Sequence, residues 1–563
     1  MTQATSSMTW KEAVAAVTAP GQRFALGEAE IDGRVVTVFE NTPPSLRAVF
    51  AAARSHPGDF LVYEDERWSF AEVMSRADEI ATLLVDRYGV RPGDRVAIAM
   101  RNYPEWIVSF AAITSVGAIA VSMNAWWTAD EMVYGLEDSG ATVLIGDRER
   151  VERAAPAMER LGLRALSVRA DTVPEGVDRL EDHRIPGATM PDVEVGPDDD
   201  AIILYTSGTT GHPKGAVSTH RAVLSALMAF GCRTAVTRLM SPPKEEHPFP
   251  VSFILVVPLF HVTGLIPVMM SCFATGYKLV MMYKWSPERA LEHIETEKIT
   301  TFVGVPTQSW DLLESPDFAR RNTESVLSVG GGGAPAPPEL IQRIEKGFER
   351  GRPGIGYGMT ETNAFGPGIS GDEILARPRS CGRAIVPMEI KVADDEAREV
   401  PCGEIGEIWF YGPTLIRGYW NNPEATAETI VDGWLRSGDL GRMDDEGFLY
   451  IEDRAKDMVL RAGENVYSAE VEAAIYEYPA VYEAAVFGLP HERLGEEVAC
   501  AILPKPGMQI DVGELQAHLR QRLAPFKIPS VVEIADEPLP RNPAGKFLKR
   551  EIRDAVSARH GRA

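Results

Sequence analysis

Strand-like and helix-like segments alternate along the first half of the chain, and this alternation limits the possible folds more than any other feature. Residues 95–100, 141–145 and 201–205 are short apolar runs typical of buried strands. Residues 68–88 have the spacing of an amphipathic helix, and residues 104–121 predict a mostly buried one. Strands that alternate with helices in this way form βαβ units, so we expect an α/β fold with mostly parallel sheets.

A change of pattern after residue 451 divides the chain into two unequal parts. We expect a large N-terminal domain of βαβ-type subdomains over residues 1–452, a charged hinge over 453–457, and a small, mobile α+β domain over 458–563. Residues 150–200 and 235–250 are interpreted as surface connections within the large domain. The 563 residues suffice for a large buried core and for a cleft between the domains.

The composition is that of a globular protein with an acidic surface. Hydrophobic residues make up 45% of the chain and charged residues 25%, and the formal net charge is -24. This balance argues against a nucleic-acid partner, so a polyphosphate substrate must be bound by a few well-placed Lys and Arg residues. The five cysteines are widely spaced and form no metal-binding pair, which fits a reducing cytosol.

Two segments bear on the location of the protein. The N-terminus lacks a basic start followed by an apolar core, so we expect no signal peptide. Residues 253–276 carry no formal charge and are about long enough to cross a bilayer. They also contain Pro258, His261 and Pro267, which favours a buried strand–turn–helix. We therefore expect a cytoplasmic protein without a transmembrane span.

Residues 205–215 form the strongest local motif. Three glycines permit unusual backbone dihedrals, four hydroxyls add hydrogen-bond donors, and Lys214 adds a positive charge. These groups together would bind a polyphosphate. The motif is not a Walker A sequence, because it joins two strand-like segments and the next helix starts near Ser218. The residues assigned to the phosphates are Thr206, Ser207, Gly208, Thr209, Thr210, Gly211 and Lys214.

This loop resembles the phosphate loop of the ANL superfamily of adenylate-forming enzymes. That superfamily comprises acyl- and aryl-CoA synthetases, adenylation domains of nonribosomal peptide synthetases, and beetle luciferases. The resemblance covers almost the whole chain, and the motifs occur in the family's order. After the phosphate loop they are Pro258–His261, Gly332–Pro335, Tyr357–Glu361, Gly433–Asp439, Asp453–Lys456, Gly463–Asn465 and Pro540–Lys546. The resemblance implies an AMP-forming acyl-CoA synthetase of the fatty-acid–CoA ligase type.

The resemblance also implies a first half-reaction in which a carboxylate attacks the α-phosphorus of ATP and pyrophosphate leaves. Both reactants are anionic, so catalysis consists mainly of alignment and charge neutralisation. Thr360 would bind the α-phosphate and Glu361 would hold Mg²⁺, a cation that prefers oxygen ligands. Lys546, on a loop that contains Pro and Gly, would contact the α-phosphate and the attacking carboxylate. The catalytic residues implied are thus Thr360, Glu361 and Lys546.

The rest of the ATP site follows from the same resemblance. Tyr357 would offer an aromatic face to adenine, and Asp439 would accept hydrogen bonds from both ribose hydroxyls. Arg454 would reach the ribose or a phosphate. Backbone at the glycine run would approach the edge of the base. The ATP-binding residues outside the phosphate loop are Gly332, Gly333, Ala334, Pro335, Tyr357, Gly358, Thr360, Asp439, Arg454 and Lys546.

In the second half-reaction the thiol of coenzyme A would attack the acyl carbonyl and displace AMP. Lys546 would obstruct this approach, and in the family the small domain rotates, with Lys456 at the matching hinge position. Gly463, Glu464 and Asn465 would then face the tunnel for the thiol. The substrates implied are ATP, Mg²⁺, coenzyme A and a small carboxylic acid, and a homodimer is possible for such an enzyme.

The acid itself is predicted from the segment around His261. Relatives that activate amino acids carry an aspartate in this region to pair with the α-ammonium group, and a histidine in an apolar setting does not supply that charge. The predicted acyl pocket is apolar, which favours a bulky or elongated hydrophobic acid. Its residues are His261, Val262, Thr263, Gly264, Val305 and Gly331. We expect a medium- or long-chain fatty acid, with aryl or steroid-side-chain acids as the alternative.

Three other functions share these motifs. A ligase could deliver its adenylate to a carrier protein, and a luciferase-type enzyme would react it with oxygen. A non-catalytic nucleotide sensor would be expected to lack some of Lys214, Glu361, Asp439 and Lys546. All four residues are present, which favours an enzyme.

Overall fold

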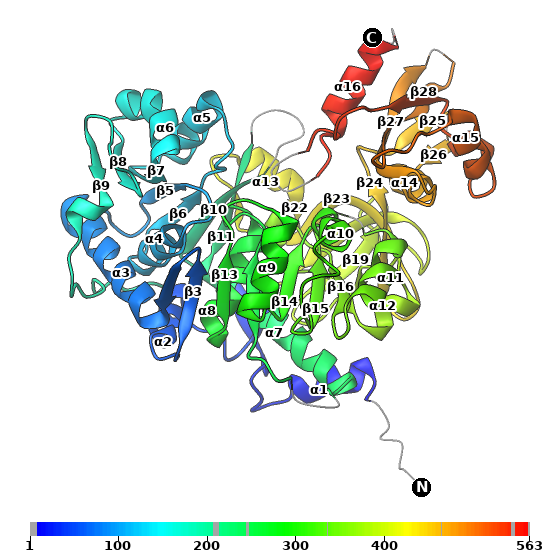
Figure 1. The fold of residues 1–563 in the computed structure, drawn as a ribbon. Coiled ribbons are helices and arrows are strands. Elements are labelled where there is room, and N and C mark those ends of the chain that lie inside the picture. Colours follow the sequence, from blue (N-terminus) through cyan, green and yellow to red (C-terminus); the bar gives the residue numbers. More distant parts are fainter. Residues whose placement is uncertain are drawn as a thin grey trace.

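An eight-stranded sheet forms one side of the molecule in the computed structural model (Figure 1). The structure describes residues 8–206, 213–243, 247–334, 336–462, 464–491, 493–541 and 546–560. From β10 to β9 every neighbouring pair in this sheet is parallel, as predicted, whereas β11 and β21 join it antiparallel. In spatial order the strands are β21 (Gly418–Tyr419), β11 (Lys214–Thr219), β10 (Asp200–Thr206), β6 (Ile119–Ser122), β5 (Arg95–Ala99), β7 (Val143–Asp147), β8 (Arg164–Val168) and β9 (Val177–Arg179).

The helices around this sheet are α3 (Phe70–Thr82) with η1 (Leu83–Arg87), α4 (Pro104–Ser115), α5 (Ala129–Ser139), α6 (Arg148–Leu161) and η2 (Leu180–His183). The helix predicted over 68–88 begins where Ser69 caps it: Ser69 Oγ accepts from the backbone N–H of Glu72 at 3.2 Å. The helix predicted over 104–121 is too long. It ends at Ser115, because Gly117 takes a left-handed conformation (φ +72°) that directs the chain into β6.

The interpretation of residues 150–200 as a surface connection is also wrong. This stretch contains most of α6 and the strands β8 and β9. Val151 and Ala154 of α6 are buried, as are Leu166 and Val168 of β8, so the segment completes the parallel sheet. Of the second predicted connection, residues 235–240 belong to the helix α7 (His220–Met240).

A second sheet of fourteen strands crosses the centre of the molecule (Figure 1). Its strands from β3 to β16 by way of β13, β12, β14 and β15 are parallel, and the remaining pairs are antiparallel. The strands are β3 (Asp59–Tyr63), β4 (Glu66–Ser69), β12 (Ser252–Leu255), β13 (Lys278–Met281), β14 (Thr301–Gly304), β15 (Ser328–Gly331), β16 (Arg352–Gly356), β17 (Gly368–Ser370), β18 (Gly382–Arg383), β19 (Glu389–Ala393), β20 (Gly406–Tyr411), β22 (Ile430–Val431), β23 (Trp434–Met443) and β24 (Phe448–Arg454).

The other helices of the large domain lie in the connections between the strands. They are α2 (Leu46–Ala53), α7, η3 (Gly264–Met270), α8 (Ser271–Thr275), α9 (Pro287–Glu297), α10 (Pro306–Glu314), α11 (Pro338–Gly347), η4 (Thr360–Thr362), α12 (Asp372–Ala376) and α13 (Pro423–Thr429). Near the N-terminus, α1 (Trp10–Val17) is followed by a hairpin of β1 (Leu26–Ile31) and β2 (Arg34–Phe39). The strand–turn–helix predicted over 253–276 is confirmed by β12, η3 and α8.

One helix, α7, is long and apolar enough to cross a membrane by length and composition alone. Nine of its residues are buried, and it packs against α1 and η3. A core helix passes the same length and composition test as a membrane span.

The C-terminal part has a sheet and hydrophobic clusters of its own (orange to red in Figure 1). The strands are β25 (Val459–Arg461), β26 (Glu464–Val466), β27 (Val481–His491), β28 (Gly495–Pro504) and β29 (Val531–Ile534), with helices α14 (Ser468–Tyr476), α15 (Val512–Arg520), η5 (Pro525–Lys527) and α16 (Lys549–Arg559). The chain leaves the central sheet at Arg454 and enters this sheet at Val459. A short turn at 455–458 is therefore the covalent connection between the two sheets.

Candidate active site

Four of the predicted site segments follow parallel strands. The phosphate loop follows β10, the segment of His261 follows β12, and the glycine run and the Tyr357 motif follow β15 and β16. The carboxyl ends of parallel strands are where α/β proteins bind their ligands, because the loops there converge. Lys546 reaches the same place from the C-terminal part of the chain.

The two ends of the phosphate loop are fixed by an antiparallel pair. Thr206 and Lys214 are paired residues of β10 and β11, and Thr206 Oγ1 donates to the carbonyl oxygen of Lys214 at 3.4 Å. The Lys214 ammonium lies 5.1 Å from the centre of the Tyr419 ring. Ser207, Gly208, Thr209, Thr210 and Gly211 lie outside the described residues, as do Pro335 and Gly463. The two described ends of the phosphate loop thus lie on adjacent, paired strands.

Glu361, the predicted magnesium ligand, is 7% exposed. The Tyr419 hydroxyl donates to Glu361 Oε1 at 2.7 Å, and burial together with this carboxylate raises the pKa of Tyr419 well above its usual value. The phenol therefore stays protonated and orients the carboxylate. Thr360 precedes Glu361 at the start of η4, a one-turn 3₁₀-helix.

The residues around Glu361 fit a Mg²⁺ ion that is shared with phosphates. In the described part of the chain, no three His, Cys, Asp or Glu side chains form a group that could hold a metal ion. Mg²⁺ commonly takes one or two carboxylates and completes its shell with water and substrate phosphates. Glu361 supplies one such carboxylate, and Lys214 marks the predicted position of the phosphates. The ion would therefore bind together with ATP.

The predicted adenosine residues contact one another. The Tyr357 hydroxyl donates to Asp439 Oδ2 at 2.6 Å, and Arg454 Nε lies 3.4 Å from Asp439 Oδ1. Asp439 and Arg454 are paired residues of β23 and β24. Burial, followed by the Asp439 carboxylate, raises the pKa of Tyr357 well above its usual value. Both carboxylate oxygens of Asp439 are thus already oriented by neighbours before a ribose binds.

Two glycines allow close approaches in this region. A Cβ on Gly358 would lie 2.4 Å from the carbonyl oxygen of Ala364, so no other residue fits there. Gly333 takes φ +76°, and a Cβ there would lie 4.0 Å from Lys546 Cε and 4.0 Å from Val305 Cγ1. Lys546 therefore lies against the glycine run, where adenine and the acid are both predicted to bind.

Lys546 lies in a cluster of charges. Burial, and then the positive charges of Arg454 and Lys456, lower the pKa of Lys546, and Asp439 and Glu361 oppose the shift, so that the pKa is about 8. Asp439 and Arg454 belong to the central sheet, Lys456 to the turn at 455–458, and Glu361 to η4. The structure thus brings together the three residues predicted to be catalytic, Thr360, Glu361 and Lys546.

The predicted acid pocket begins beside this cluster. Burial, and then the nearby charge of Lys546, lowers the pKa of His261 to about 4, so the imidazole is neutral at pH 7. Its Nε2 atom is buried and has no hydrogen-bond partner among the described residues. Val262 and Gly264 are buried next to it, and a Cβ on Gly264 would lie 2.3 Å from the carbonyl oxygen of Pro258. Thr263, Val305 and Gly331 are partly exposed.

Comparison with known proteins identifies the family. The model of the AMP-binding enzyme family matches residues 49–420, and that of the AMP-binding enzyme C-terminal domain matches residues 470–546. The chain belongs to the AMP-binding enzyme family.

The relatives of this AMP-binding enzyme differ in their acids. A feruloyl-CoA synthase from Amycolatopsis sp is 36% identical over 508 residues, which is 89% of this chain and 95% of the relative. A long-chain-fatty-acid–CoA ligase from Mycobacterium tuberculosis is 36% identical over 501 residues, 88% of this chain and 94% of the relative. The solved structure of o-succinylbenzoate CoA synthetase from Bacillus subtilis, with its acyl-adenylate intermediate, has a TM-score of 0.77 at 30% identity and covers 91% of this chain and 98% of that one. The fold is that of the adenylate-forming enzymes.

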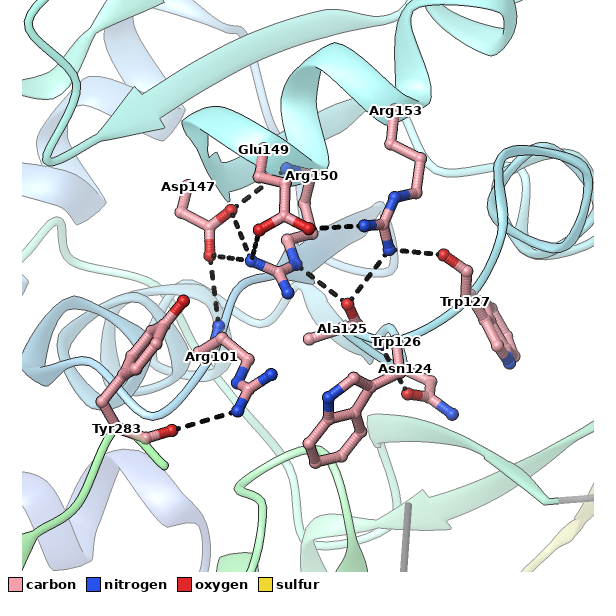
Figure 2. Close-up of polar contacts among 10 residues, drawn as sticks. All are labelled: Arg101, Asn124, Ala125, Trp126, Trp127, Asp147, Glu149, Arg150, Arg153 and Tyr283. Carbon is pink, nitrogen blue, oxygen red and sulfur yellow. Dashed lines mark hydrogen bonds and ion pairs between the residues drawn. The ribbon is translucent and has the colours of Figure 1, made fainter. Parts of the chain in front are cut away.

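The AMP-binding enzyme also has a feature beside the acid pocket that the sequence prediction missed. Trp126 is 40% exposed, and its ring lies 5.0 Å from that of Phe260, the neighbour of His261. Figure 2 shows how the loop of Trp126 is held: Arg150 Nε donates to the carbonyl oxygen of Ala125 at 2.9 Å, and Arg153 Nη1 donates to that of Trp127 at 2.6 Å. The two adjacent tryptophans at 126 and 127 were the sequence signal for such a fixed aromatic surface.

The same loop is contacted by an arginine from the end of β5. The Arg101 guanidinium lies 4.7 Å from the Trp126 ring centre and 4.9 Å from that of Tyr283, and Nη2 donates to the Tyr283 carbonyl oxygen at 3.4 Å (Figure 2). The exposed indole is therefore held by its contact with Arg101 as well as by the hydrogen bonds of its own loop. It forms a rigid apolar rim next to the segment of His261.

The residues predicted for the second half-reaction of the AMP-binding enzyme occupy different surroundings. Lys456 lies in the exposed turn at 455–458, where the predicted hinge falls. Glu464 and Asn465 are exposed on β26, which forms one edge of the C-terminal sheet. Among the described residues, those predicted for adenylation lie together, and Glu464 and Asn465, predicted for the thiol tunnel, lie on the surface.

Proposed function

We propose that this enzyme activates a hydrophobic carboxylic acid with MgATP and transfers the acyl group from acyl-AMP to coenzyme A. The observation that carries the proposal is the position of Lys546. Its side chain lies against Gly333, in a charge cluster with Glu361 and Asp439, although it comes from the C-terminal domain. A cation in that position is suited to a reaction between two anions.

In the first step, a carboxylate oxygen forms a bond to the α-phosphorus of ATP, and the bond to pyrophosphate breaks. Lys546 neutralises charge on the α-phosphate and the attacking carboxylate, with Thr360 at the same phosphate. Glu361 holds Mg²⁺, which when bound offsets the negative charge of the leaving pyrophosphate. Lys214 and the phosphate loop hold the β- and γ-phosphates. Tyr357, Asp439 and Arg454 orient the adenosine.

In the second step, the thiol sulfur of coenzyme A bonds to the acyl carbon, AMP leaves, and the thiol proton passes to solvent. Lys546 has to leave the site before the thiol approaches. The short exposed turn with Lys456 is where the C-terminal domain would rotate, and Gly463, Glu464 and Asn465 would then line the thiol tunnel. These assignments are supported by the single short connection between the two sheets and by the exposure of Glu464 and Asn465.

The acid is proposed to be hydrophobic because the segment of His261 does not carry the aspartate that relatives use to pair with the α-ammonium group of an amino acid. The imidazole of His261 is neutral, the residues around it are apolar, and Trp126 and Phe260 form an aromatic rim. A medium- or long-chain fatty acid is the first candidate. The long-chain-fatty-acid–CoA ligase among the relatives supports this choice.

An aryl acid is the second candidate, and one observation favours it. The buried Nε2 of His261 has no partner among the described residues, and a buried polar atom without a partner is costly. A hydroxylated aromatic acid could supply that partner, whereas an alkyl chain could not. The feruloyl-CoA synthase among the relatives acts, by its name, on an acid of this kind.

We place the enzyme in the cytoplasm as a soluble protein, and a homodimer is the assembly we would test first.

The test is to incubate the purified enzyme with MgATP, coenzyme A and a panel of acids, and to measure AMP and thioesters by mass spectrometry. The panel contains fatty acids of increasing length, hydroxycinnamates, steroid-side-chain acids and acetate, with Lys546→Ala as the inactive control. We expect AMP and an acyl-CoA in equal amounts with the best hydrophobic acid. Acid-dependent pyrophosphate release without an acyl-CoA would contradict the proposed acceptor and point to a carrier protein or oxygen.

A further inference from the structure

A hydrogen bond joins the C-terminal domain to the large domain away from the turn that connects them. The hydroxyl of Tyr482, in β27, donates to Asp311 Oδ1 at 3.3 Å, and Asp311 belongs to α10. The other carboxylate oxygen of Asp311 accepts from Trp285 Nε1 at 2.8 Å. Asp311 is therefore anchored within the large domain and presents one oxygen to the C-terminal domain.

The side chain of Tyr482 is directed toward Asp311 by an irregularity in its strand. Val481 pairs with Pro504 and Glu483 pairs with Leu503, so the register shifts at Tyr482. A bulge of this kind re-aims the side chain that it contains. Burial, followed by the Asp311 carboxylate, raises the pKa of Tyr482 to about 12, so its hydroxyl remains a donor at neutral pH.

The next residue, Glu483, links this contact to the segment that carries Lys546. Glu483 is buried, its Oε1 lies 3.0 Å from Arg541 Nη2, and its Oε2 accepts from the backbone N–H of Leu539 at 2.8 Å. Arg541 in turn forms an isolated bridge with Phe547, and its guanidinium lies 3.9 Å from the Phe547 ring centre. Phe547 is the direct neighbour of Lys546. Two consecutive residues of β27 thus contact the large domain and the base of the lysine segment.

On the side of the large domain, α10 also leads to Lys546. The helix starts at Pro306, directly after Val305, and Val305 Cγ1 and Lys546 Cε both lie 4.0 Å from the Cβ position of Gly333. Asp311 is thus on a rigid element that begins at the wall of the site. A shift of Tyr482 relative to Asp311 would shift Lys546 relative to Gly333.

The surroundings of the contact indicate an interface that can open. A cleft open to solvent lies next to it, between α10 and α11 on one side and α14 and β27 on the other. Trp310, Tyr476 and Lys505 are among its lining residues. The two domains are therefore not joined there by a continuous apolar interface, and interfaces between mobile domains are commonly small and polar.

We propose that Tyr482 is a positioning residue for adenylation, which through Asp311 docks the C-terminal domain so that Lys546 lies in the site. This inference rests on the proposed function and adds a docking contact to it. The contact belongs to the acyl-AMP-forming arrangement and breaks before the thiol step. Tyr482 touches neither substrate in this account and acts only through the position of Lys546.

The test compares Tyr482→Phe with a matched control, Tyr478→Phe. The Tyr478 hydroxyl donates to Glu514 Oε2, also at 3.3 Å, but both residues lie within the C-terminal domain. Acid-dependent pyrophosphate exchange measures adenylation, and the conversion of supplied acyl-AMP to acyl-CoA measures the thiol step. For Tyr482→Phe we expect exchange to fall about threefold to tenfold, the effect of one hydrogen bond, while the thiol step is unchanged or faster. Tyr478→Phe should alter neither step.

A cross-link provides a second measurement that does not depend on a weakened variant. In the variant Asp311→Cys, Tyr482→Cys the two thiols are joined by a bismaleimide that is about as long as the two replaced side chains. The chain also carries Cys402→Ser, since Cys402 is exposed and the other natural cysteines are buried. The cross-linked enzyme should form acyl-AMP but lose the thiol step at least tenfold relative to the same protein before cross-linking.

The possible outcomes separate this inference from the proposed function. If Tyr482→Phe leaves exchange unchanged, or lowers both steps equally, the docking role is wrong although the ligase assignment stands. A cross-linked enzyme that makes acyl-CoA at the rate of the free one would also overturn it. A wild-type protein without acid-dependent exchange for any acid of the panel would overturn the proposed function, and the docking role with it.

Discussion

On the nucleotide side of the site the polar side chains are held by one another, whereas on the acid side the imidazole of His261 has a buried nitrogen with no partner among the described residues. Tyr357 donates to Asp439, and Tyr419 donates to Glu361. Groups that are oriented before a ligand binds lose little entropy when it arrives. The nucleotide side is therefore preorganised for one ligand. On the acid side, the buried nitrogen of His261 can still form a hydrogen bond with the substrate.

Removal of Lys546 should show the largest effect, because this residue reaches both sides. With Lys546→Ala we expect adenylation to fall about 10²–10³-fold, the usual loss when one electrostatic contact to the transition state is removed. Thioester formation from supplied acyl-AMP should be nearly normal. The two half-reactions would be measured separately by pyrophosphate exchange and by mass spectrometry of acyl-CoA. An equal loss of both would mean that the lysine serves both steps.

Most residues of the nucleotide side could be assigned from the sequence because they lie in recognisable motifs. Tyr357 and Glu361 belong to one loop, and the residues of the Asp439 and Arg454 motifs pair across adjacent strands. The tyrosine that holds Glu361 was not predicted, since it lies 58 residues further along the chain in no recognised motif. Tyr482 and Asp311 are 171 residues apart, and only the arrangement of the domains brings them together. Contacts of this kind depend on packing, which local pattern does not encode.

A pair of substitutions at the ribose position tests whether the nucleotide side is held as a unit. Asp439→Ala should raise the KM for ATP about 10- to 100-fold, because hydrogen bonds to a charged group are lost. Tyr357→Phe removes only the hydroxyl that orients this carboxylate, so we expect a rise of about threefold to tenfold. The relative kcat/KM values for different acids should be unchanged in both variants. Altered acid preference would show that the two sides are not independent.

The pH dependence of adenylation should follow the charge of Lys546. Its pKa is about 8 in the free enzyme, so the ammonium form predominates below pH 8 and is lost as the pH rises through that value. We expect kcat/KM for adenylation to be level below about pH 7, to fall to about half near pH 8, and at higher pH to decrease about tenfold per pH unit. The thiol step from supplied acyl-AMP, assayed at a fixed thiolate concentration, should lack this decrease. A profile that stays level to pH 10 would contradict the requirement for a charged Lys546.

The smallest effect is expected at His261, and it should appear in the choice of acid rather than in the use of ATP. His261→Phe keeps a ring of similar size and removes the unpartnered nitrogen, so the KM for ATP should be unchanged. If the best wild-type acid carries an aromatic hydroxyl that contacts Nε2, its kcat/KM should fall about threefold to tenfold relative to a fatty acid. If the best acid is a fatty acid, the substitution removes a buried polar atom without a partner, and the kcat/KM for that fatty acid should be equal or higher.

Competition between the two acids in one reaction gives the ratio of their kcat/KM values directly. A change in the KM for ATP without a change in that ratio would place His261 on the nucleotide side, contrary to its position next to the apolar rim of Trp126 and Phe260.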